Sequence, residues 1–193
     1  MKSMIFDDNG IIEKDITYKF KILLLGDPAV GKTSLLVRFI EDKFDEKYIA
    51  TIGVNFMVKN LNIQSEIVLL TIWDIAGQAP FTSYRNLYYR GCDYVIFMFD
   101  IVNKQSLLNL PIWINNYRRI ISGDVNFCVI GNKSDLEHLR NVEAREYSMI
   151  FPPFQDKMSF FMETSAKTGE NVDEAFDIIT TQLITKAKNK KTQ

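Results

Sequence analysis

Cysteine and histidine are scarce in this 193-residue sequence, which holds two cysteines and one histidine. A structural zinc site of the Cys/His type needs four such ligands, so the sequence excludes one. Cys92 and Cys128 both stand among apolar residues, which predicts buried, reduced thiols and a reducing compartment. A chain of this length buries roughly 70 % of its unfolded surface and needs no disulfide to fold.

The sequence also lacks long apolar runs and an excess of charge. No stretch approaches the ~20 apolar residues of a membrane span. Lys and Arg total 23 against 24 Asp and Glu, giving a formal net charge of −1. A domain that binds nucleic acid is typically strongly basic, so we expect no nucleic-acid partner for this protein. Hydrophobic residues make up 47 % and charged residues 24 %, which predicts a single ordered domain.

Both ends of the chain differ from the middle. Residues 1–17 place acidic residues between short apolar pairs and lack the apolar centre of a secretory signal, so we expect a polar extension. Residues 188–193 form a basic tail. The remaining residues, 18–187, are predicted to form the domain.

Apolar runs alternate with segments of helical periodicity along that domain. Strand-like runs lie at 18–25, 54–62, 66–74, 94–99, 125–130 and 159–162. Helical spacing of apolar residues marks 33–41, 105–121 and 172–183. Pro111 predicts that the second helix is distorted or begins late. Residues 54–62 and 66–74 predict an antiparallel hairpin, and the whole alternation predicts an α/β fold with a mostly parallel sheet covered on both faces.

Residues 26–33 fit the phosphate-loop pattern G-x-x-x-x-G-K-[ST], between a predicted strand and a predicted helix. Backbone N–H groups of such a loop wrap a phosphate, and Gly31 lets the chain pass close to it. Lys32 supplies a cation to the β- and γ-phosphates, while the Thr33 hydroxyl ligates Mg²⁺. The dipole of the following helix adds to the attraction.

Two further segments at predicted strand ends indicate which nucleotide base is bound and which reaction takes place. In Asn132-Lys-Ser-Asp135, the Asp135 carboxylate can accept from the N1–H and 2-amino groups of guanine, a donor pair that adenine lacks, with the Lys133 stem along the base. Asp74 can hold Mg²⁺ through a water. Gly77 offers an N–H to a γ-phosphate and Gln78 can orient an attacking water, although the pattern around Gln78 taken alone favours an ordinary solvent-exposed loop amide.

Six segments together resemble the small GTPases of the Ras superfamily, most closely the Rab branch. They are Gly26–Ser34, Tyr48–Phe56, Trp73–Gln78, Tyr88–Gly91, Asn132–Asp135 and Glu163–Lys167, in family order. The resemblance implies a P-loop NTPase fold of the small G-protein type. Its six-stranded sheet is mostly parallel with one antiparallel strand, and helices flank both faces. It also implies binding of GDP and GTP with Mg²⁺, and slow GTP hydrolysis that switches effector binding through switch I and switch II.

The resemblance assigns individual roles. Thr51 would reach Mg²⁺ and the γ-phosphate, Phe44 would pack against guanine, and Tyr48 would close over the phosphates. Catalysis falls to Gln78 and Lys32, and metal binding to Thr33, Thr51 and Asp74. The implied nucleotide-binding residues are Asp27, Pro28, Ala29, Val30, Gly31, Lys32, Thr33, Ser34, Phe44, Tyr48, Thr51, Gly77, Asn132, Lys133, Asp135, Ser165, Ala166 and Lys167. Effectors, exchange factors and activating proteins would read Phe56, Trp73 and Tyr88, for which packing between the switches is the alternative.

Departures from the family pattern keep a second hypothesis open. Pro28 has no N–H and a fixed φ, and Ala79-Pro80 replaces the usual acidic–basic pair after Gln78. The alternative is therefore a nucleotide-dependent binding module with negligible hydrolysis. A P-loop kinase or ATPase is a third reading, against which N-K-x-D argues.

The sequence ends Lys-Lys-Thr-Gln193, without the terminal cysteine that prenylation needs. Either it is truncated here or the protein does not anchor as Rab proteins do. We expect a cytoplasmic monomer with at most peripheral membrane contact through its basic residues.

Overall fold

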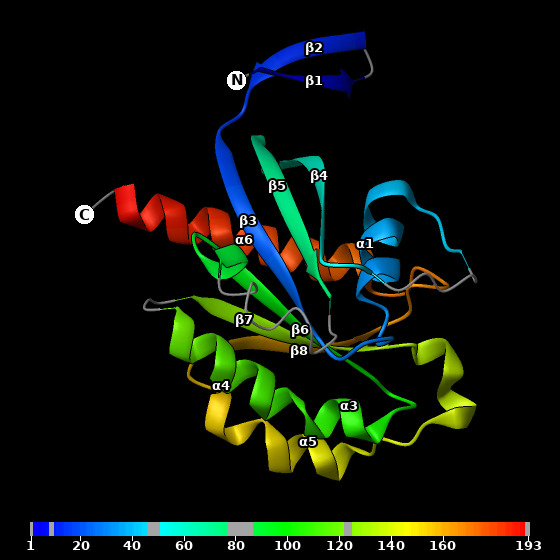
Figure 1. Ribbon diagram of the computed structural model, residues 1–193. Helices are drawn as coiled ribbons and strands as arrows, with labels where there is room; N and C mark the ends of the chain where they lie inside the picture. Colours follow the sequence, from blue (N-terminus) through cyan, green and yellow to red (C-terminus); the bar gives the residue numbers. More distant parts are fainter. Residues whose placement is uncertain (1, 8–9, 46–50, 77–86, 122–124, 192–193) are drawn as a thin grey trace.

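A six-stranded sheet forms the centre of the molecule (Figure 1). The computed structural model describes residues 2–7, 10–45, 51–76, 87–121 and 125–191. The strands are β3 (Tyr18–Gly26), β4 (Val54–Ile63), β5 (Glu66–Ile75), β6 (Tyr94–Asp100), β7 (Asn126–Asn132) and β8 (Met158–Thr164). They lie in the order β4-β5-β3-β6-β7-β8, and only β4 runs antiparallel, paired with β5. The predicted mostly parallel sheet with one antiparallel strand is confirmed.

Helices cover both faces of the sheet. They are α1 (Lys32–Glu41), α3 (Lys104–Leu108), α4 (Leu110–Ile120), α5 (Ala144–Ile150) and α6 (Val172–Lys191), with 3-10 turns η2 (Ser134–Leu139) and η3 (Pro152–Phe154). In Figure 1, α1 and α6 lie on one side of the sheet, and α3, α4 and α5 lie on the other.

The apolar run of β3 shows why a two-sided sheet forms. Ile22 and Leu24 belong to the core cluster that includes residues of α1 and α6, whereas Leu23 and Leu25 belong to the cluster under α4. All four side chains are fully buried. Successive residues of a strand point to opposite faces, so an unbroken apolar run requires a layer on each side.

Pro111 separates two helices that the sequence pattern presents as one. Helix α3 ends at Leu108, and Pro111 lies in the first turn of α4. A backbone N–H in a first helical turn has no partner within the helix, so proline is tolerated there. The late start is therefore the correct alternative.

The described part of residues 1–17 forms a two-stranded sheet of its own. Strands β1 (Lys2–Asp7) and β2 (Gly10–Asp15) pair antiparallel, from Lys2 with Asp15 to Asp7 with Gly10. The sequence reading presents this segment only as a polar extension.

Both cysteines are buried and unpaired, as predicted. The Cys92 sulfur lies 2.9 Å from the Tyr117 hydroxyl oxygen. Burial raises the pKa of both thiols, which keeps them protonated at neutral pH. Within the described ranges, no helix has both the length and the apolar character needed to cross a membrane.

Candidate functional site

A cavity of about 310 Å³ opens at the carboxyl ends of the parallel strands. Three loops, after β3, β7 and β8, supply most of its wall. The lining residues are Ala29, Gly31, Ser34, Phe44, Asp45, Asn132, Lys133, Asp135, Leu136, Ala166 and Lys167. Asp45 and Leu136 were not predicted from the sequence. Their only sequence signal is that each directly follows a predicted site residue, Phe44 and Asp135.

The phosphate loop joins β3 to α1 and encloses the charge of Lys32. The Lys32 side chain is buried, and its ammonium donates to the carbonyl oxygens of Gly26 at 2.9 Å and Asp27 at 2.8 Å. Gly31 has a φ of +95°, and a Cβ there would stand 2.2 Å from the Asn132 amide nitrogen. Only glycine satisfies both the dihedral and the close approach.

Pro28 and Ala29 make this loop stiff. Proline fixes its own φ. Ala29 has a φ of +63°, in the left-handed region, which costs a residue with a Cβ about 1–2 kcal/mol. Contacts elsewhere must hold the loop in this conformation.

Asp27 supplies one such contact. Its carboxylate accepts from the Trp113 indole N–H at 2.7 Å and from the Asn109 amide at 2.6 Å. Asn109 lies between α3 and α4 and Trp113 lies within α4, so the Asp27 side chain is directed to these helices. Any contact of Asp27 with a phosphate would therefore be made by its main chain.

Trp113→Phe is expected to destabilise the protein by about 2 kcal/mol, because a hydrogen bond to a carboxylate is lost. This corresponds to a fall in melting temperature of roughly 4–8 °C, measured by calorimetry. Trp73→Phe is the matched control, since the Trp73 indole nitrogen is buried without a hydrogen-bond partner in the described ranges. Equal falls for the two variants would show that the Asp27 contact contributes nothing.

Three oxygen-bearing side chains converge beside the phosphate loop. Thr33 is the second residue of α1, Asp74 lies near the end of β5, and Thr51 precedes β4. The Thr33 hydroxyl donates to Asp74 Oδ2 at 2.5 Å, the Thr51 hydroxyl lies 3.1 Å from the same oxygen, and the two hydroxyls are 2.7 Å apart.

This cluster fits a magnesium ion. Asp74 is fully buried, and its other oxygen, Oδ1, has no hydrogen-bond partner in the described part of the chain. An unsatisfied buried carboxylate oxygen is costly unless a cation balances it. Neighbouring ligands of octahedral Mg²⁺, each about 2.1 Å from the ion, lie about 3 Å apart, which is close to the 2.7 Å between the Thr33 and Thr51 hydroxyl oxygens.

Asn132 joins the phosphate loop to the loops at the other end of the cavity. Its amide nitrogen donates to the Val30 carbonyl at 3.0 Å. Its amide oxygen accepts from the Thr164 hydroxyl at 3.2 Å and the Ala166 N–H at 3.1 Å. The buried amide therefore fixes three loops relative to one another.

Asp135 and Lys133 are also oriented by neighbours. One Asp135 oxygen accepts from the Ser165 hydroxyl at 2.6 Å. Lys133 has a φ of +73°, and its ammonium pairs with Asp100 at 2.6 Å. The Asp100 partner anchors the tip of Lys133, which leaves its apolar stem along the cavity wall.

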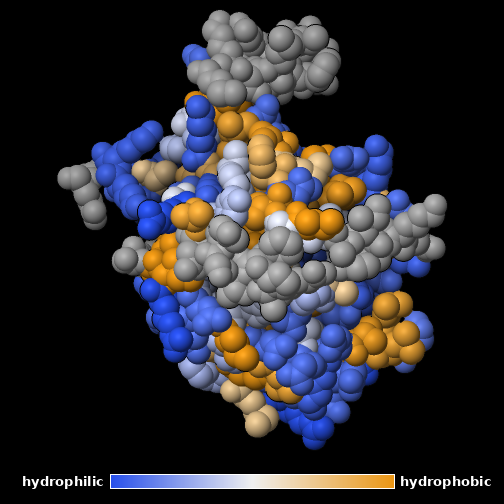
Figure 2. All heavy atoms as spheres, in the orientation of Figure 1, coloured by the Kyte–Doolittle hydropathy of each residue, from blue (hydrophilic) through white to orange (hydrophobic). Residues whose placement is uncertain are grey.

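The three aromatic residues predicted for effector binding lie together. The Phe56 and Trp73 rings stack with centroids 5.1 Å apart, and Tyr88 lies 5.9 Å from Trp73. Phe56 remains 56 % exposed. Figure 2 shows hydrophobic colour over the surface formed by β4 and β5. The three side chains thus pack against one another while Phe56 stays exposed at the surface.

Some predicted residues lie outside the described ranges. These are Tyr48, Gly77 and Gln78, together with Ala79 and Pro80. Their roles stay predictions.

Comparison with known proteins agrees with this arrangement. Residues 21–185 match the model of the Ras family. The Ras-related protein Rab-8B of Homo sapiens is 38 % identical over 177 residues, which cover 92 % of this chain and 84 % of the relative. Rab-8 of Diplobatis ommata is 38 % identical over 177 residues, covering 92 % and 83 %. Rab-13 of Rattus norvegicus is 37 % identical over 173 residues, covering 90 % and 84 %. The chain therefore belongs to the Ras family, and it is a Rab-like small GTPase of the Ras superfamily.

Proposed function

We propose that the protein binds GDP and GTP together with Mg²⁺, hydrolyses GTP slowly, and uses the nucleotide state to control effector binding. The observation that carries this proposal is the cavity, which Ala29 and Gly31 of the phosphate loop line beside the buried Lys32, and which the Asp135 carboxylate lines from the loop after β7. A cation beside the phosphate loop suits phosphates, and an acceptor from the loop after β7 suits the donor edge of guanine.

The chain's own residues would divide the work of hydrolysis. Lys32 and the loop N–H groups bind the phosphates and stabilise the charge that develops between the β- and γ-phosphates. Thr33, Thr51 and Asp74 would hold Mg²⁺, which neutralises phosphate charge when bound. Gln78 would orient the attacking water. No arginine in the phosphate-loop sequence offers itself as a finger in cis, so an activating protein would supply one and raise the rate by roughly 10³–10⁵.

The switch would act through Thr51. This residue is tied to Thr33 and Asp74 in the cluster and leads directly into β4, which carries Phe56. Loss of the γ-phosphate would release Thr51 and Gly77 and so alter the surface around Phe56, Trp73 and Tyr88. We propose that effectors, exchange factors and activating proteins bind there, and that the protein acts as a monomer with at most peripheral membrane contact.

Single-turnover GTP hydrolysis tests this function against the alternative of a binding module. We expect a slow but measurable rate that falls by roughly tenfold or more in Gln78→Leu, because the attacking water loses its orienting amide. The preloaded protein is incubated with Mg²⁺ and released phosphate is followed with time.

Gln155→Leu is the matched control, because Gln155 is exposed beyond η3 near the amino end of β8. It should hydrolyse GTP at the unaltered rate. Tight GTP binding with one common rate in wild type and Gln78→Leu would favour the binding module. ATP bound at submicromolar concentrations would contradict both readings.

A further inference from the structure

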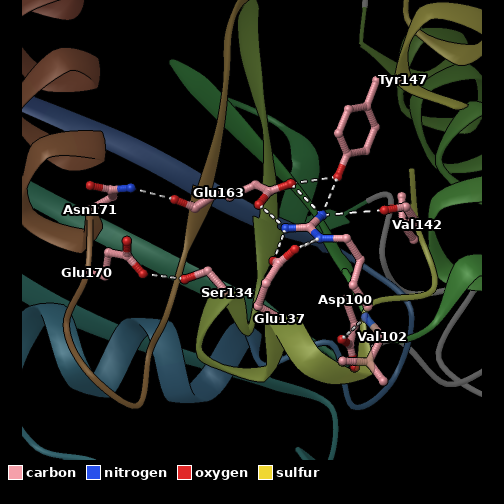
Figure 3. A network of polar contacts seen from close by, with 10 residues as sticks. Asp100, Val102, Ser134, Glu137, Val142, Tyr147, Glu163, Glu170 and Asn171 are labelled. Atoms are coloured by element: carbon pink, nitrogen blue, oxygen red, sulfur yellow. Dashed lines mark hydrogen bonds and ion pairs between the residues drawn. The ribbon is translucent and has the colours of Figure 1, made fainter. Parts of the chain in front are cut away.

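Arg140 lies directly after η2 and contacts two carboxylates at once. Its Nε donates to Glu137 at 2.7 and 2.8 Å, and its Nη2 donates to the same group at 2.5 Å. On the other side, Nη1 and Nη2 donate to the two oxygens of Glu163 at 2.9 and 2.6 Å. Figure 3 shows these contacts converging between Glu137, Glu163 and Tyr147.

The two carboxylates belong to the two segments that form the base end of the cavity. Glu137 stands two residues after Asp135, and Glu163 stands two residues before Ser165. The guanidinium therefore links the segment that carries the guanine-selective carboxylate to the segment that carries Ala166. A rigid planar fork fixes the separation of the groups that it bridges.

Further contacts hold Glu163 from α5 and from the residue before α6. The Tyr147 hydroxyl donates to Glu163 at 2.6 Å and accepts from Arg140 at 3.2 Å. The Asn171 amide donates to the Glu163 carbonyl at 2.8 Å. Groups from three separate segments thus fix the position of Glu163, and Arg140 connects it to Glu137 of η2.

Burial decides which half of the bridge matters more. The side chains of Arg140 and Glu163 are 22 % and 25 % exposed, whereas that of Glu137 is 66 % exposed. Exposed ion pairs are screened and contribute little, so the pair with Glu163 is the stronger one. The Arg140 hydrogen bonds hold the pKa of Glu163 below its usual range, and both groups are charged at neutral pH.

We propose that Arg140 is a positioning residue for guanine recognition: by bridging Glu137 and Glu163 it holds Asp135 and Ala166 at the separation that the base requires. The inference rests on the proposed nucleotide function. It predicts that losing the bridge weakens discrimination at the edge of the base that Asp135 reads. Loss of global stability alone would not have this effect.

Arg140→Gln tests this role through the dissociation of GDP and IDP from the full chain in Mg²⁺. Hypoxanthine, the base of IDP, lacks the 2-amino group of guanine. The ratio of the GDP and IDP dissociation rates (the GDP-to-IDP ratio) therefore reports how well Asp135 is placed to accept from that group. We expect GDP to leave about tenfold faster and IDP only about threefold faster, so that discrimination falls about threefold. Arg140→Lys keeps the charge without the fork and should change the ratio in the same direction.

Arg118→Gln is the matched control. Arg118 pairs with Asp156 at 2.8 Å near the amino ends of β7 and β8, away from the cavity. The Arg118→Gln variant should leave the GDP-to-IDP ratio unaltered, whatever its effect on thermal stability. Should Arg140→Gln fail to fold, Arg140→Lys decides the result. A ratio equal to that of wild type in the folded variants would overturn the role of Arg140, whereas a wild type that does not retain GDP would overturn the proposed function instead.

Discussion

Asp135→Asn is expected to lower the affinity for GDP by about 10³-fold and to raise that for XDP. The carboxylate accepts from two donors of guanine, and the asparagine amide presents a donor in place of one acceptor. Truncating one partner of a buried charged hydrogen bond costs about 2–5 kcal/mol, and 4 kcal/mol corresponds to about 10³-fold. Xanthine carries an oxygen where guanine carries the 2-amino group, so it complements the new donor.

The structure favours a folded variant, which makes this a clean test. The Asp135 oxygen that accepts from Ser165 can be replaced by the amide oxygen of asparagine, and the 2.6 Å contact retained. Affinities for GDP, XDP and ADP are measured by competition with a fluorescent nucleotide. Asp156→Asn is the control, because the Asp156 side chain is 62 % exposed and remote from the cavity. An unaltered preference for guanine in Asp135→Asn would remove Asp135 from base selection.

Local sequence signals account for most of the fold and for the separate parts of the site. Continuous apolar runs identify strands buried on both faces because each strand satisfies the pattern by itself. The phosphate loop and the Asn132–Asp135 segment are equally local, since each needs only a strand before it. That they meet at one cavity follows from the parallel sheet, whose carboxyl strand ends share one edge.

Contacts between distant segments could not be predicted in this way. The bond from Trp113 to Asp27 and the bridge from Arg140 to Glu163 join residues whose sequence neighbourhoods carry no mark of the partner. The N-terminal hairpin, in which Gly10 of β2 pairs with Asp7 of β1, was not predicted either, because acidic residues separate the short apolar pairs of this segment.

Thr33→Ala is expected to abolish most of the dependence of GDP binding on magnesium. In wild type, chelating Mg²⁺ with EDTA should speed GDP release by about 100-fold, because the ion joins the phosphates to the chain. The variant lacks the hydroxyl that lies 2.5 Å from Asp74 Oδ2, so EDTA should then have little effect. Release of a fluorescent GDP is followed with and without EDTA.

Two further variants separate metal binding from the packing of the cluster. Thr33→Ser keeps the hydroxyl and should retain the response to EDTA, whereas a full response in Thr33→Ala would place the ion elsewhere.

Thr51 should behave differently from Thr33, because its proposed role includes the γ-phosphate: Thr51→Ala would weaken GTP binding and leave GDP binding nearly unaltered. All these variants retain Asp74 Oδ1, which has no hydrogen-bond partner among the residues that the structure describes. Removing the ion should therefore lower the stability of the protein as well as its affinity for nucleotide. The same cluster would thus couple the ion and the phosphates to the segment that leads into β4.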